Sequence, residues 1–94
     1  MTYTVQVKQS TAATTWITIG RQYNTIRGAR KDLYKSLLTA RYVGRIINNK
    51  NNKVVGEGSW AIAHKTLYRV PGKTLDDRKY YQLYKDGSIK NWHR

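Results

Sequence analysis

Apolar and polar residues alternate at the start of the chain. Tyr3, Val5 and Val7 are separated by polar residues, and Ile17 and Ile19 resume the same period after the polar stretch STAATT. A period of two is typical of a β-strand with one buried face, because successive side chains point to opposite sides of a sheet. We therefore expect a first hairpin in which two short strands are joined by a loose loop.

A second hairpin is predicted over 42–57. The Asn-rich link NNKNN separates RYVGRII from KVVGEG, and asparagine adopts the positive φ angles that tight turns need. We interpret Gly56 and Gly58 as turn glycines. The next segment, SWAIAHKTLYRV, is compatible with either a strand or a helix, because alanines that tolerate both states interrupt its alternation.

The strongest turn signal is the Asp86-Gly87 pair, which lies between two alternating runs near the C-terminus. Taken as a two-residue turn, this pair predicts a hairpin in which Tyr84 faces Ile89 across the strands. Aromatic cross-strand pairs stabilise a sheet by about 0.2–1 kcal/mol each. The chain is therefore expected to end in a hairpin.

Residues 25–41, TIRGARKDLYKSLLTAR, have the period of an amphipathic helix. Thr25 or Asn24 can cap its start by accepting hydrogen bonds from free backbone N–H groups. On a helical wheel the apolar positions fall within one arc about 80° wide. This apolar stripe, which we expect to face the core, consists of Ile26, Ala29, Leu33, Leu37 and Ala40.

Together these elements predict an α+β fold, in which a small antiparallel β-sheet of two or three hairpins packs against one main α-helix. The length of 94 residues suits one modest core, so we expect a single domain over 1–94. Within it, 1–58 form a strand-strand-helix-strand-strand unit, and 59–94 form a C-terminal extension that ends in a β-hairpin.

The chain carries 18 Lys and Arg residues against five Asp and Glu, for a net charge of +13 and an isoelectric point near 10.3. Such a charge says little about the fold, but it indicates association with a polyanion, because excess like charge repels itself in a folded protein. Nucleic acid is the first candidate partner, an anionic membrane surface the second and an acidic protein the third. The alternative is that the charge only keeps the protein soluble.

The predicted helix sorts its cations to one side. Its acid, Asp32, lies on the other flank of the apolar stripe, whereas a helix face that is merely solvated is expected to mix both signs. Tyr34 lies among the cations and the tyrosines of KYYQLYK lie near the C-terminus, and tyrosine can stack on a base. The predicted nucleic-acid-binding residues are Arg27, Arg30, Lys31, Tyr34, Lys35, Arg41, Arg45, Lys50 and Lys53.

The sequence lacks the residues that catalytic and metal-binding sites need. The chain has no Cys, which excludes disulfides, thiolate chemistry and zinc sites built on Cys. Metal sites need clustered ligands, and His64 and His93 are far apart in the sequence. We interpret Asp76-Asp77 as ordinary acids at a helix start rather than a magnesium site. We therefore expect no catalytic residue, no metal, no cofactor and no small-molecule substrate.

Three functions remain. The first is a non-catalytic protein that binds DNA or RNA, mainly through the phosphate backbone and with weak sequence preference. The second is a protein-binding inhibitor of a host nucleic-acid enzyme, of the anti-CRISPR or anti-restriction type, whose partner is an acidic or RNA-bearing protein complex. The third is a metal-free endoribonuclease toxin. The compact, basic composition, rich in Asn and Tyr, resembles that of small proteins from phages or mobile elements.

The location is expected to be cytoplasmic. The N-terminal residues MTYTVQVKQ lack the basic and apolar regions of a signal peptide. No apolar run approaches the roughly 18 residues that span a bilayer, and the predicted helix lacks the second apolar band of a membrane-surface helix. We therefore expect no membrane partner.

Overall fold

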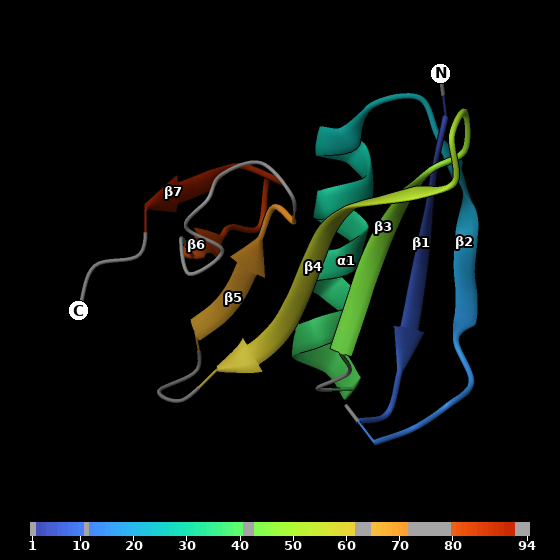
Figure 1. Ribbon diagram of the computed structural model, residues 1–94. Helices are drawn as coiled ribbons and strands as arrows, with labels where there is room; N and C mark the ends of the chain where they lie inside the picture. Colours follow the sequence, from blue (N-terminus) through green and yellow to red (C-terminus); the bar gives the residue numbers. More distant parts are fainter. Residues whose placement is uncertain (1, 11, 41–42, 62–64, 72–79, 92–94) are drawn as a thin grey trace.

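The computed structural model describes residues 2–10, 12–40, 43–61, 65–71 and 80–91, which contain one helix and seven strands. The elements in chain order are β1 (Tyr3–Lys8), β2 (Ile17–Tyr23), α1 (Ile26–Ala40), β3 (Val43–Asn48), β4 (Lys53–Ala61), β5 (Lys65–Arg69), β6 (Tyr80–Leu83) and β7 (Ile89–Asn91). The strands form one antiparallel sheet in the order β2-β1-β3-β4-β5-β6-β7, and α1 packs on it (Figure 1). The predicted α+β fold with one main helix is confirmed, although the sheet has more strands than predicted.

The sheet changes its connectivity at α1. β1 pairs with both β2 and β3, so α1 carries the chain across β1 from one of its neighbours to the other. From β3 onward each strand pairs with the next one in the sequence. As a result, β2 lies at one end of the sheet and β5 to β7 lie at the other, with α1 between them (Figure 1). No helix in the described part of the chain is long and apolar enough to cross a membrane.

The first two predicted hairpins are confirmed where the structure describes them. β1 pairs with β2, and β3 pairs with β4. Asn52, in the Asn-rich link, adopts a φ of 57°, as its turn chemistry predicts. The segment that was ambiguous between strand and helix forms the end of β4 and all of β5, while residues 62–64 lie outside the described ranges.

The apolar stripe of α1 faces the core, as predicted. Gly28 donates a backbone hydrogen bond of 3.1 Å to the Thr25 hydroxyl, which caps the helix. Ile26 is half-buried against the core, and Ala40 is the last residue of α1. The fully buried apolar residues of α1, β1 and β3 are Ala29, Leu33, Leu37, Val5, Val7 and Ile46.

The interpretation of Gly56 and Gly58 as turn glycines is wrong. Both lie within β4. Because glycine has no side chain, other residues of the core contact the strand backbone directly at these two positions. A Cβ on Gly58 would lie 2.9 Å from Leu37 Cδ1, and one on Gly56 would overlap the Tyr68 hydroxyl and lie 2.6 Å from Tyr68 Cζ. Glycine in a strand interior often marks such a close approach. These two positions therefore let α1 and the Tyr68 ring pack directly on the backbone of the sheet.

The predicted pairing of Tyr84 with Ile89 is also wrong, by one residue. Ile89 pairs with Leu83. The Tyr84 backbone N–H donates a hydrogen bond of 2.9 Å to the Ser88 carbonyl, and the Tyr84 carbonyl accepts one of 2.9 Å from the Gly87 N–H. The loop therefore spans residues 85–87 rather than two residues. Gly87 has a φ of +84°, as expected of a three-residue loop that ends in a left-handed glycine. A two-residue turn of the Asp-Gly type would need positive φ at the aspartate as well.

Gly56→Ala should lower the free energy of unfolding by about 1–3 kcal/mol, the usual cost of overpacking a core. The cause is the buried Tyr68 ring, which has to move away from the new methyl group. Urea denaturation followed by tryptophan fluorescence measures the loss.

A second variant tests the cause. The buried Tyr68 hydroxyl has no hydrogen-bond partner among the described residues, so Tyr68→Phe should cost little, because an unpaired buried hydroxyl is itself unfavourable. Gly56→Ala should cost less in the Tyr68→Phe background than in the wild type. Equal costs in both backgrounds would show that the ring is not the obstacle.

Candidate nucleic-acid interface

The predicted binding residues fall on different parts of the structure. Five of them lie on α1, as predicted. Arg45 lies in β3 between Gly44 and Ile46, which face α1, so strand alternation places Arg45 on the opposite face of the sheet. Lys50 is exposed in the turn between β3 and β4, and Lys53 is exposed at the first residue of β4 beside this turn. Arg41 lies outside the described residues.

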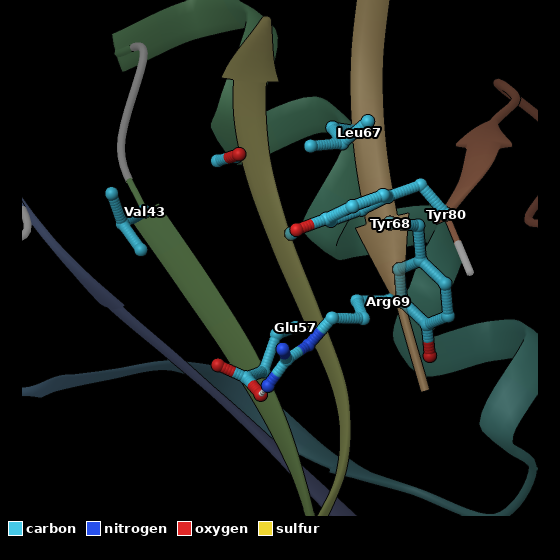
Figure 2. A pocket seen from close by; sticks show the side chains of 8 residues that line it. Val43, Glu57, Leu67, Tyr68, Arg69 and Tyr80 are labelled. Atoms are coloured by element: carbon cyan, nitrogen blue, oxygen red, sulfur yellow. Dashed lines mark hydrogen bonds and ion pairs between the residues drawn. The ribbon is translucent and has the colours of Figure 1, made fainter. Parts of the chain in front are cut away.

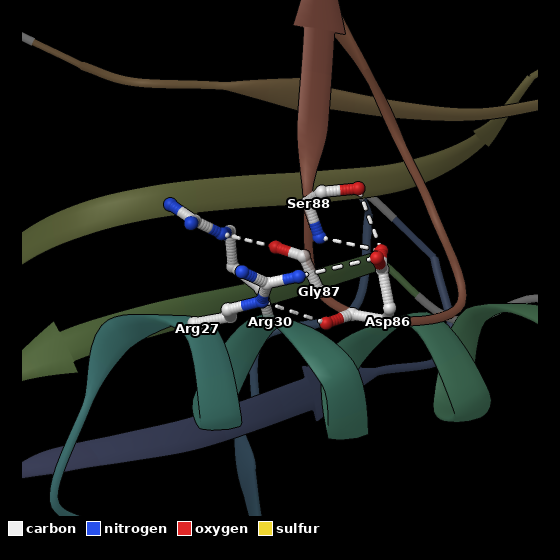
Figure 3. A network of polar contacts seen from close by, with 5 residues as sticks. All are labelled: Arg27, Arg30, Asp86, Gly87 and Ser88. Carbon is white, nitrogen blue, oxygen red and sulfur yellow. Dashed lines mark hydrogen bonds and ion pairs between the residues drawn. The ribbon is translucent and has the colours of Figure 1, made fainter.

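Two of the helix arginines hold the turn between β6 and β7 (Figure 3). Arg27 Nη2 lies 3.1 Å from Asp86 Oδ2, and Arg27 Nε donates a hydrogen bond of 3.2 Å to the Asp86 carbonyl. Arg30 Nε donates a hydrogen bond of 2.7 Å to the Gly87 carbonyl. The Arg30 guanidinium also lies 5.9 Å from the centroid of the buried Tyr68 ring. These cations are therefore engaged within the protein and join the C-terminal hairpin to the start of α1.

Asp86 organises the other side of this contact. Its Oδ1 accepts hydrogen bonds of 2.6 Å from the Ser88 hydroxyl and 3.0 Å from the Ser88 backbone N–H (Figure 3). These two bonds, together with the charge of Arg27, hold the pKa of Asp86 below its ordinary value. The carboxylate is therefore charged at neutral pH and keeps both Ser88 and Arg27 in place.

Three lysines beside this contact are uncompensated. Lys31 and Lys35 on α1 and Lys85 in the β6–β7 loop are exposed, and none of them has an ion pair or hydrogen bond among the described residues. Lys90 on β7 is also exposed, and its Nζ lies 5.4 Å from the centroid of the Tyr84 ring. We call these four lysines the lysine surface: Lys31, Lys35, Lys85 and Lys90.

An open hollow of about 490 Å³ lies within the lysine surface. Tyr84 is half-buried in it, while the lysines around it are exposed. Tyr34, which the sequence placed among the cations, is instead half-buried and packs against the core. The residues that line the hollow are Lys31, Tyr84, Lys85, Asp86, Ser88 and Lys90.

Sequence reasoning missed Lys85 and Lys90, because nothing local relates them to a helix more than 50 residues earlier. The sequence contained one part of the evidence for this site. The KYYQLYK cluster, which contains Tyr84, was a candidate for base stacking, but no sequence pattern indicated that this cluster lies beside Lys31. The residue pairs that create the hollow are the long-range contacts of Arg27 and Arg30 with the β6–β7 loop.

On the opposite face of the sheet, Arg45 belongs to a row of polar side chains. Gln6, Arg45, Glu57 and Arg69 are directly opposite one another on successive strands. Arg45 Nε donates a hydrogen bond of 2.9 Å to Gln6 Oε1, and the Arg45 guanidinium lies 4.1 Å from the centroid of the Trp16 ring. Arg45 is therefore held by contacts within the protein, on the face of the sheet opposite α1.

A smaller hollow of about 220 Å³ opens beside Glu57 and Arg69 (Figure 2). Arg69 Nη2 lies 3.1 Å from Glu57 Oε1, so the two charges in the hollow compensate each other. The remaining residues that line it are Val43, Gly58, Ser59, Leu67, Tyr68 and Tyr80. This hollow lacks the excess of cations that distinguishes the lysine surface.

No group of three or more His, Cys, Asp or Glu side chains that could hold a metal ion lies in the described part of the chain. His64, His93, Asp76 and Asp77 lie outside it. The acid of α1, Asp32, lies on the flank away from the cations, where its Oδ2 accepts a hydrogen bond from the Tyr23 hydroxyl on β2. Partial burial and this bond to a carboxylate raise the pKa of Tyr23 to about 12.

The raised pKa of Tyr23 makes stability depend on pH in alkaline solution. Between about pH 10 and pH 12 the unfolded phenol loses its proton while the folded one keeps it. The folded state then binds more protons than the unfolded state, so the free energy of unfolding falls as the pH rises. The advantage of the wild type over Tyr23→Phe in urea denaturation should be complete below this window and shrink across it. A constant difference through the window would contradict the assignment.

Arg30→Gln should lower the free energy of unfolding by about 1.5–3 kcal/mol, because Arg30 makes a partly buried, charged hydrogen bond to Gly87. Lys31→Gln, the matched change at the next position, should alter it by no more than about 0.5 kcal/mol, because Lys31 is exposed. Thermal and urea denaturation of both variants measure the difference. Similar losses in the two variants would mean that Arg30 does not attach the hairpin.

Comparison of the chain with family models, with curated proteins and with solved structures gives no match. We therefore infer the role of the lysine surface from the charges, distances and burial of its own residues.

Proposed function

We propose that the protein is a non-catalytic nucleic-acid-binding protein, and that the lysine surface of α1 and the β6–β7 hairpin contacts the phosphate backbone. One observation supports this above all. The fold gathers lysines from distant segments at a place where the nearby acid, Asp86, is already bound to Arg27 and Ser88. Such a concentration of like charge is unfavourable in the isolated protein and favourable against a polyanion.

The chemistry of the surface favours contacts with the backbone over contacts with base edges. Lysine ammonium groups are flexible point charges, whereas a rigid arginine fork is the usual reader of guanine in the major groove. The helix arginines that could act as such forks are engaged by Asp86 and Gly87. We therefore propose weak sequence preference on DNA or RNA.

A membrane surface is a poorer partner for these residues. A helix that lies in the membrane interface needs an apolar band beside its basic face. On the outward side of α1, Leu38 is the exposed large apolar residue among those described, with 38% of its surface accessible. The proposal includes a cytoplasmic location, where nucleic acids are abundant, and an origin in a phage or mobile element.

The second candidate uses the same surface. An acidic or RNA-bearing host protein offers carboxylates or phosphates to the same lysines, so a protein-binding inhibitor of a host nucleic-acid enzyme fits the same charges. Affinity capture with the purified protein from nuclease-treated lysate distinguishes the two. One stoichiometric protein partner that survives nuclease treatment supports the inhibitor, whereas loss of all captured material supports direct binding of nucleic acid.

Binding to a DNA duplex should weaken steeply with salt. Four phosphate contacts, one for each residue of the lysine surface, imply a slope of about −3.6 when the logarithm of the association constant is plotted against that of the salt concentration. Fluorescence anisotropy over a salt series measures the slope. A flat dependence would contradict binding to the phosphate backbone.

Matched variants locate the surface. Lys31→Gln with Lys85→Gln should weaken binding to all sequences alike and make the slope shallower by about 1.8, because two phosphate contacts are lost. Lys50→Gln with Lys53→Gln removes the same charge from the exposed β3–β4 turn and should leave the slope nearly unchanged. A larger effect of the second pair would move the interface to that turn.

A further inference from the structure

We propose that the hollow at Tyr84 binds an unpaired nucleotide, so that the protein prefers single-stranded nucleic acid to duplex. This inference rests on the proposed function and adds a ligand class to it. It depends on the arrangement of aromatic, cationic and acidic groups in the hollow, which is more specific than the positive charge of the surface around it.

One aromatic side chain and three cations line the hollow. Tyr84 is half-buried, while Lys31, Lys85 and Lys90 around it are exposed. Lys90 Nζ lies over the Tyr84 ring, 5.4 Å from its centroid. The hollow has a volume of about 490 Å³ and is wide open to solvent, so a nucleotide that remains part of a longer strand can reach it.

A nucleotide suits this combination of lysines and tyrosine because it carries an anionic phosphate and a flat aromatic base. The lysines attract the phosphate, and the flat face of the base can stack on the tyrosine ring. Asp86 and Ser88 lie in the same hollow. The Asp86 oxygens already bind Arg27 and Ser88, but a carboxylate has further lone pairs that can accept a hydrogen bond from the amino group of a base. The lysines therefore favour the phosphate, and Tyr84 favours the base.

Only an unpaired base can stack on Tyr84. In a duplex the bases are stacked on one another and paired, so that the phosphate ridge meets the lysines and no base face is free. In a single strand the bases expose their faces, and aromatic side chains of proteins take them up with little regard for sequence. Stacking of a base on Tyr84, which lines the hollow together with three exposed lysines, would thus favour a single strand over a duplex.

The hollow is formed before any ligand arrives. Arg27 and Arg30 attach the β6–β7 loop to α1 through Asp86 and Gly87. A Cβ at Gly87 would overlap the Arg27 carbonyl, so the loop backbone lies directly against the helix. A site whose two walls are already joined loses less conformational freedom on binding.

The test compares a fluorescein-labelled DNA single strand of mixed sequence with the duplex of the same length, by anisotropy at one low salt concentration. The wild type should bind the single strand about tenfold more tightly. Tyr84→Ala should weaken single-strand binding by about 5- to 100-fold, as loss of base stacking does, and leave duplex binding within about twofold. Tyr84→Leu, which keeps apolar volume without a flat ring, should behave like Tyr84→Ala, while Tyr84→Phe should bind like the wild type.

Tyr80→Ala is the matched control, because Tyr80 is an exposed tyrosine at the start of β6, the strand that Tyr84 follows, and it lines the other hollow. It should leave both affinities unchanged. Equal binding of single strand and duplex, or an unchanged affinity in both Tyr84→Ala and Tyr84→Leu, would overturn the inference and leave the proposed function standing. Failure to bind either form at low salt would overturn the proposed function itself.

Discussion

The hydrogen bond from Arg30 to the Gly87 carbonyl is the contact on which the candidate site depends. It joins the first turns of α1 to a loop 57 residues later, and Arg27 and Asp86 reinforce it from the exposed side. A charged hydrogen bond that is partly shielded from water is stronger than an exposed ion pair. Arg30 therefore contributes most of the attachment, and Arg27 with Asp86 sets the orientation of the loop. Without this attachment Lys31 and Tyr84 would not share a hollow.

The few acids of the chain explain why the lysine surface remains positive. Each acid in the described part of the chain is engaged by residues other than these lysines. Asp32 accepts a hydrogen bond from Tyr23, and Glu57 forms an ion pair with Arg69. Asp86 binds Arg27 and Ser88. None of these carboxylates pairs with a residue of the lysine surface in the described part of the chain. The protein thus separates cations that hold the fold together from cations that face solvent, and only the second kind is suited to bind phosphate.

Local sequence patterns predicted the helix and the first two hairpins well, but they predicted the last loop and the close contacts between strands poorly. The stripe that contains Leu33 and Leu37, the cap at Thr25 and the first two hairpins depend on neighbouring residues, and all were recovered. The pairing near Asp86 was wrong by one residue, because two-residue and three-residue loops share the Asp-Gly signal. Gly56 was misinterpreted because its reason lies in Tyr68, a residue of the next strand whose ring packs over it.

The candidate site also has one part that local sequence patterns predicted and one part that they did not. Periodicity and charge along 25–41 were enough to place cations on one flank of α1 and Asp32 on the other, since a helical wheel needs only local spacing. Which of those cations stay exposed was beyond any local pattern. Arg30 and Lys31 are adjacent in the sequence, yet one is bound to the hairpin and the other faces solvent. The difference arises from a loop more than 50 residues away, and long-range packing of that kind becomes visible only when the chain is folded.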